Sequence, residues 1–145
     1  MTAVLSNSDN LNALLQAHWV DAQAVPKAKI FWGTRQFDLP KQLTQVSQVY
    51  LITTYKVSPA RVKPLSLSWW QTDELITVEV AVKVSSTCAS DREKMVEMIR
   101  NIIHTYQTGL SGVNFISIIA EKSGDAENLL RHTFTVNARY FHKKT

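Results

Sequence analysis

Hydrophobic and polar side chains alternate along residues 75–84, which read Leu-Ile-Thr-Val-Glu-Val-Ala-Val-Lys-Val. Because successive side chains of a β-strand point to opposite faces, this pattern predicts a long strand with one buried face. The buried face would carry Ile76, Val78, Val80, Val82 and Val84. The opposite face would carry Thr77, Glu79, Ala81 and Lys83. These side chains are too small and too evenly charged for plain exposure to solvent, so we expect a neighbouring subunit to cover them.

A strongly amphipathic helix is predicted directly after this strand. Ser90 and Glu93 have the spacing of a capping box, in which a hydroxyl and a carboxylate each accept a bond from a backbone N–H at the helix start. Gly109 predicts the end of the helix. Residues at helical spacing predict its buried stripe, which consists of Met95, Ile99, Ile102, Ile103 and Tyr106.

An earlier helix is predicted over residues 8–24, with Ser8 and Asp9 at its start and Pro26 after its end. Its stripe consists of Leu11, Leu14, Leu15, His18 and Ala22. A short strand is expected at 29–32 and a turn at 37–40. Residues 41–48, rich in Gln, Ser and Thr, are expected to link elements.

The middle of the chain predicts two further strands, at 49–57 and 65–70, because both are rich in apolar and β-branched or aromatic residues. The polar residues 71–74 are expected to form a turn, so that 65–84 would be an antiparallel hairpin. Between these two strands, Arg61 and Lys63 with two nearby prolines predict an exposed basic loop.

Two last strands are predicted at 113–121 and 129–141, joined by a turn at 122–127 that contains Gly124. In the final strand Thr133, Thr135, Asn137 and Arg139 alternate with apolar residues and repeat the mixed face of 75–84. The order of helix, strands, helix and strands predicts one α+β domain over residues 1–145. Its sheet would be mostly antiparallel, with the two helices packed on one face.

Composition agrees with such a domain. The 145 residues are 45% hydrophobic and 19% charged, which are ordinary globular values, and the net charge of +4 is only mildly basic. Apolar runs are shorter than a membrane span, and the first residues lack the pattern of a signal peptide. We therefore expect a soluble protein, made in the cytoplasm and without a membrane partner.

The candidate chemistry is sparse. The four glycines form no phosphate-binding loop, and the histidines show no metal-binding spacing, although His18 and His104 would approach each other if their helices packed side by side. Cys88 and His104 are the only nucleophile and base pair worth testing. Adjacent acidic residues at 73 and 74 are expected in a solvated turn. The sequence thus predicts no catalytic, cofactor or metal site.

Trp69 and Trp70 are neighbours in a predicted strand, so one ring should point inward and one outward. Three interpretations of the outward ring remain open. It is a surface ring lying over a neighbouring side chain, an aromatic anchor in a protein interface, or a ring that stacks on a nucleic-acid base, for which the basic and aromatic interleaving is sparse.

Three segments together resemble the tail terminator (tail completion) proteins of long-tailed bacteriophages. They are residues 70–84, the helix from Asp91 to Tyr106, and the final strand ending Phe-Thr-Val-Asn-Ala-Arg-Tyr at residue 140. The resemblance covers residues 8–142. The chain departs from the family pattern in the basic segment near Arg61 and in the basic tail His142-Lys143-Lys144.

The resemblance implies a virion structural protein, assembled in the host cytoplasm, that caps the tail tube as a hexameric ring. The ring would stop tube growth, meet the head connector or stopper protein, and let DNA pass without sequence recognition. Candidate subunit contacts are Thr77, Glu79, Lys83, Thr135 and Arg139, and a loop facing a partner or the lumen would carry Lys56, Arg61 and Lys63. The alternatives are another phage neck or tail protein, a small nucleic-acid-binding domain, and a hydrolase using Cys88 and His104.

Overall fold

The computed structural model describes residues 6–35, 49–57, 59–110, 112–126 and 129–143. Ten elements follow one another: α1 (Asn7–Ala17), the 3-10 turns η1 (Asp21–Gln23) and η2 (Lys27–Lys29), β1 (Ile30–Gly33), β2 (Tyr50–Lys56), β3 (Arg61–Pro64), β4 (Trp69–Lys83), α3 (Cys88–Thr105), β5 (Phe115–Ala126) and β6 (Leu129–Lys143).

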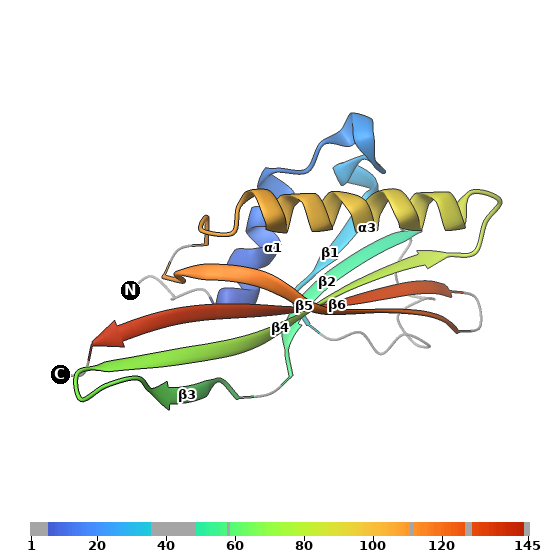
Figure 1. Ribbon diagram of the computed structural model, residues 1–145. Helices are drawn as coiled ribbons and strands as arrows, with labels where there is room; N and C mark the ends of the chain where they lie inside the picture. The colour runs from blue at the N-terminus through green and yellow to red at the C-terminus, as the bar shows by residue number, and fades with distance from the viewer. Residues whose placement is uncertain (1–5, 36–48, 58, 111, 127–128, 144–145) are drawn as a thin grey trace.

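All six strands belong to one mixed sheet with the order β1-β2-β4-β6-β5, and β3 pairs with the first residues of β4. Only β1 and β2 are parallel; the other pairs are antiparallel. Both helices lie on the same side of this sheet (Figure 1). The predicted fold class, α+β with a mostly antiparallel sheet and two helices on one face, is therefore confirmed.

The core lies between the helices and one face of the sheet. Ile76, Val78, Val80 and Val82 are fully buried there, as the alternation predicts. On the neighbouring β6 the same face carries Phe134, Val136 and Ala138, and the helices contribute Leu11, Leu15, Met95, Ile99 and Ile103. The prediction for Val84 was wrong: β4 ends at Lys83, and Val84 is 60% exposed.

The start of α3 differs from the predicted capping box. The helix begins at Cys88, so Ser90 already lies inside its first turn. Asp91 accounts for the shift, because its Oδ2 accepts bonds from the Thr87 hydroxyl at 2.9 Å and from the Tyr50 hydroxyl of β2 at 2.8 Å. This acid therefore anchors the first turn to the sheet. At the other end α3 stops at Thr105, four residues before Gly109.

The first helix is shorter than predicted. The Oγ of Ser6, two residues before the predicted cap, accepts a bond from the backbone N–H of Asp9 at 3.2 Å, and α1 ends at Ala17, well before Pro26. The buried Trp19 gives the reason, because its indole N–H donates to the Val25 carbonyl at 2.7 Å and folds the following segment back on itself.

The predicted hairpin at 65–84 had the wrong turn. β4 begins at Trp69 and runs straight through residues 71–74, while the turn occupies 65–68, where the Leu65 N–H donates to the Trp69 carbonyl at 3.0 Å. Arg61 and Lys63 consequently lie in the exposed strand β3 and not in a loop. The polar residues of 71–74 are stable inside a strand because Asp73 is paired with Arg139 and because the buried Glu74 accepts a bond from the side-chain amide of Asn7 at 2.8 Å.

At the other edge, β5 extends to Ala126, so residues 122–126 are strand and not turn. A bulge between Ile118 and Ala120 precedes this extension and shifts the register with β6. The turn expected at 37–40, the segment 41–48, Glu127 and Lys144 lie outside the described residues. No helix in the described ranges combines the length and apolar content needed to cross a membrane.

Candidate interaction surface

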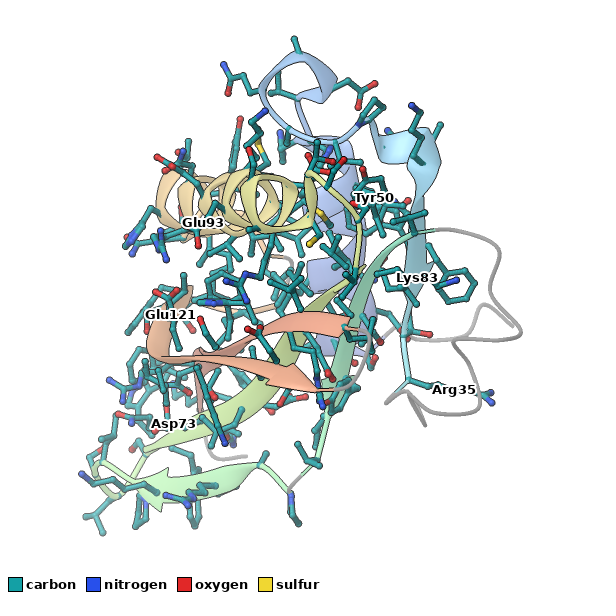
Figure 2. All side chains as sticks on the ribbon, turned by 90° about the vertical axis from the view of Figure 1, so that its right-hand side faces the viewer. Arg35, Tyr50, Asp73, Lys83, Glu93 and Glu121 are labelled. Atoms are coloured by element: carbon teal, nitrogen blue, oxygen red, sulfur yellow. The ribbon has the colours of Figure 1, made fainter. Side chains whose placement is uncertain are left out.

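The sheet face opposite the helices, here called the open face, carries an ion pair between β4 and β6. Arg139 of β6 donates from Nε to Oδ1 of Asp73 on β4 at 2.7 Å, and Gln71 and Asn137 donate to the same carboxylate. The Arg139 bond is the main reason why the pKa of Asp73 lies below its usual value. On the other side of Asp73, Arg61 of β3 is its register partner. Figure 2 labels Asp73 between these strands.

Glu79 is only 3% exposed, and its charge is balanced within the chain. Arg131 donates to its Oε1 through Nε at 2.8 Å and also through Nη2, and the Tyr55 hydroxyl donates to Oε2 at 3.1 Å. Burial, followed by the Glu79 charge, raises the pKa of Tyr55 to about 12. A neighbouring subunit is therefore not needed to cover Glu79.

Ala81 is also covered by its own chain, because it is buried with Leu51 and Leu129 and has Phe31 packed against this small cluster. The expectation that another subunit covers the whole strip of 77–83 was wrong at these two central positions. Thr77, Lys83 and Thr135 remain half-buried on the open face, and Arg139 is half-exposed despite its ion pair.

One end of the sheet projects past both helices (Figure 1). We call it the arm and define it as residues 61–73 with 139–143. Its exposed apolar side chains are Val62, Leu65, Leu67, Trp69 and Phe141, with Leu67 95% and Trp69 46% exposed. Its exposed basic side chains are Arg61, Lys63, His142 and Lys143. The arm thus combines apolar anchors with positive charge.

Of the two neighbouring tryptophans, Trp69 is the one that points outward. Trp69 lies on the open face of the arm, opposite Lys143, whereas Trp70 is half-buried on the face that the helices share. Lys56, grouped with Arg61 and Lys63 by sequence, is separated from them: it ends β2 on the helix side, with Nζ 3.9 Å from Oε1 of Glu74. The two basic residues of β3 therefore belong to the arm without Lys56.

A polar cluster beside α3 was missed by the sequence analysis. His132 of β6 contacts Ser123 Oγ through Nδ1 and Glu121 Oε1 through Nε2, each at 2.9 Å, and Arg100 of α3 donates to the same Glu121 carboxylate at 2.7 Å. Figure 2 shows Glu121 below the helix. The Arg100 bond is the largest cause of the lowered pKa of Glu121. The predicted turn at 122–127 concealed this cluster, because only an extended β5 places Ser123 opposite His132.

The contacts run from the hydroxyl of Ser123 through the imidazole of His132 to the carboxylate of Glu121. This is the order of nucleophile, base and orienting acid in a catalytic triad. Neither described cavity includes any of the three residues. Arg100 connects the cluster to α3 and thereby joins the helix to the edge of the sheet. The cluster accordingly explains how α3 is held on β5 and β6.

The pair of Cys88 and His104 is not brought together. The two residues lie near opposite ends of α3, and sixteen residues of helix correspond to about 24 Å. His18 stacks on the ring of Tyr106, with centroids 3.7 Å apart, so the imidazole has an aromatic neighbour. Among the described residues no group of three or more His, Cys, Asp and Glu side chains is placed to hold a metal ion.

Acid should weaken the ion pair of Asp73 with Arg139 and that of Glu121 with Arg100. Because Asp73 and Glu121 have lowered pKa values in the folded chain, their stabilisation is present at neutral pH and is lost as the pH falls through those values. A variant with Arg100→Gln and Arg139→Gln should therefore be less stable than the unmodified chain at pH 7, by the small amount typical of surface ion pairs. Urea unfolding should show this difference narrowing below pH 4; a constant difference would contradict the assignment.

Comparison with known proteins gives no family for this chain. No protein-family model matches it, and no curated protein matches its sequence.

Proposed function

We propose that the chain is a phage virion structural protein of the tail terminator type, which assembles as a ring, most simply a hexamer, on the end of the tail tube. The observation that carries this proposal is the arm, together with the family resemblance of residues 8–142. Exposed apolar groups concentrated in one projecting element are typical of protein interfaces, and exposed tryptophan is a common anchor in them.

A ring needs two different surfaces on each subunit, because each copy contacts the next one head to tail. In the proposed ring the arm supplies one surface, with Trp69 and Leu67 as anchors. The second surface is the part of the open face outside the arm that stays accessible around Thr77, Lys83 and Thr135. The ring would terminate tube growth and meet the head connector or stopper protein. The proposed location of the protein is therefore the virion, at the joint of head and tail.

The basic residues of the arm suit a lumen through which DNA passes. Arg61 and Lys63 are exposed on β3, and neither pairs with an acid among the described residues. Contacts from such residues to phosphates are independent of sequence. No catalytic residue, metal or cofactor is part of this proposal, and another neck or tail role for a similar ring is its nearest alternative.

Mass photometry tests whether the arm forms the contact. The unmodified chain should form free particles of about six times its 16.4 kDa mass, or else associate with the ends of added tail tubes. A variant with Leu67→Ser and Trp69→Ser should lose assembly, since its anchors are gone, while Val20→Ser, an exposed apolar residue away from the arm, should assemble normally. A chain that stays single and never associates with tubes would contradict the proposal.

The exposed cations of the arm favour nucleic-acid binding as a second candidate function. It predicts an affinity for DNA whose logarithm falls steeply and linearly with the logarithm of salt concentration, and a slope that becomes shallower in Lys63→Gln. Steep salt dependence in a chain that forms no ring would favour this candidate over the ring protein. An affinity that salt does not change would remove it.

A further inference from the structure

The open face contains a cavity near the edge of the sheet, away from the arm. Its volume is about 220 Å³, and it is lined by Lys122, Gly124, Asp125, Arg131 and Thr133. The register explains how it forms, because Lys122 pairs with Thr133 and Gly124 pairs with Arg131 on adjacent rungs of β5 and β6. Four side-chain positions on one face therefore surround a small hollow.

Gly124 contributes no side chain to the base of this cavity. A Cβ built at this residue would meet no atom within 4 Å, so space remains where any other residue would place a side chain. A glycine inside a strand often marks a site where a ligand or another backbone approaches closely. The backbone at Gly124 is not in the left-handed region, so its conformation does not require glycine.

Arg131 is held in position for binding. Its Nε and Nη2 both donate to the buried Oε1 of Glu79, and Tyr55 holds the other oxygen of that carboxylate. Nη1 makes no hydrogen bond to a described residue, and the side chain remains 36% exposed. A guanidinium fixed in this way loses little conformational freedom when it binds an anion.

The remaining groups add positive charge and a hydroxyl donor. Lys122 is exposed and forms no ion pair with a described residue, and the Thr133 hydroxyl is within the lining. The acid of the lining, Asp125, is paired on the helix side, because Arg92 of α3 donates to its Oδ1 at 2.9 Å. The cavity therefore presents an ammonium, a guanidinium and a hydroxyl to one small space.

We propose that this cavity binds a phosphate group. A tetrahedral phosphate anion matches the fixed guanidinium, the exposed lysine and the hydroxyl, which are common donors to phosphate oxygens. Free phosphate and the phosphodiester of a nucleic-acid strand share this chemistry. The inference stands on the cavity alone and does not depend on the ring.

NMR titration with inorganic phosphate tests the site. Amide signals of residues 122–124 and 131–133 should shift and saturate at millimolar phosphate. Gly124→Val, which fills the hollow with a residue that strands favour, should weaken binding about tenfold or more, and Lys122→Gln should weaken it by a similar factor. Lys94→Gln, the same charge change on α3, should leave binding unchanged. Melting curves establish that each variant is folded.

A short oligothymidylate distinguishes the two sources of phosphate. Tighter binding than inorganic phosphate, weakened by the same two variants, would identify a nucleic-acid backbone as the ligand. Binding of phosphate without the oligonucleotide would identify free phosphate or a small phosphoester. Shifts that never saturate, or that persist unchanged in Gly124→Val, would overturn the proposal.

Discussion

Replacing Phe134 with alanine should lower the free energy of unfolding by about 3–5 kcal/mol. Phe134 is fully buried on the helix side of β6, opposite Val78 of β4. It is the largest of the fully buried side chains among the described residues. Its removal would leave a cavity under α3 that the neighbouring strands cannot close, because each is fixed by a long ladder of backbone hydrogen bonds. Denaturant unfolding measures the loss.

Thr135→Ala is the matched control for this prediction. Thr135 is the next residue of the same strand, but it points to the open face and is half-buried. Its replacement should change stability by less than about 1 kcal/mol. Equal losses at 134 and 135 would show that the two faces of β6 are not buried as described.

Replacing Arg131 with methionine should be the second largest change, at about 2–3 kcal/mol. The substitution leaves Glu79, which is 3% exposed, with only the Tyr55 hydroxyl as a partner, and an unpaired buried carboxylate is costly. The partial exposure of Arg131 keeps the effect below that of a fully buried pair. Unfolding in urea at pH 7 gives the value.

A double variant distinguishes the loss of the ion pair between Arg131 and Glu79 from the loss of side-chain packing at Arg131. Adding Glu79→Gln to Arg131→Met removes the unpaired charge and should restore most of the lost stability, so the two changes should not be additive. Additive losses would mean that Arg131 acts through packing alone.

The elements with the clearest periodicity could be predicted from sequence. The alternation of 75–84 and of 133–140 identified β4 and β6 and the buried face of each, because one residue of register decides which side chains reach the core. The stripe of α3 was equally clear: Met95, Ile99 and Ile103 are fully buried. From these elements the α+β class followed.

Element ends were harder to predict, because distant residues determine them. The polar run at 71–74 looks like a turn in isolation, yet Arg139, 66 residues later, pairs with Asp73 and keeps the run in the sheet. Asp91 sets the start of α3 through Tyr50, which is 41 residues earlier. Neither contact can be predicted from the secondary-structure propensity of the neighbouring residues.

The same reason limited the prediction of the candidate surfaces. Glu79 was expected to face another subunit because its partner, Arg131, is 52 residues away in sequence. The arm was predicted only in part, through Trp69, Arg61 and Lys63. The pairing of β3 with β4 brings these residues into one surface, and the sequence did not reveal that pairing. The cavity around Gly124 depends on an extended β5, whereas its composition favoured a turn.

Electron microscopy of tail tubes tests the central proposal most directly. Tubes would be assembled from the tail tube protein that the proposal requires as the partner, with and without the purified protein, and with the variant Leu67→Ser, Trp69→Ser. The proposal predicts one ring of added density at a tube end, and tubes that stop growing there, only with the unmodified chain. Bare tube ends and unchanged growth in its presence would contradict it.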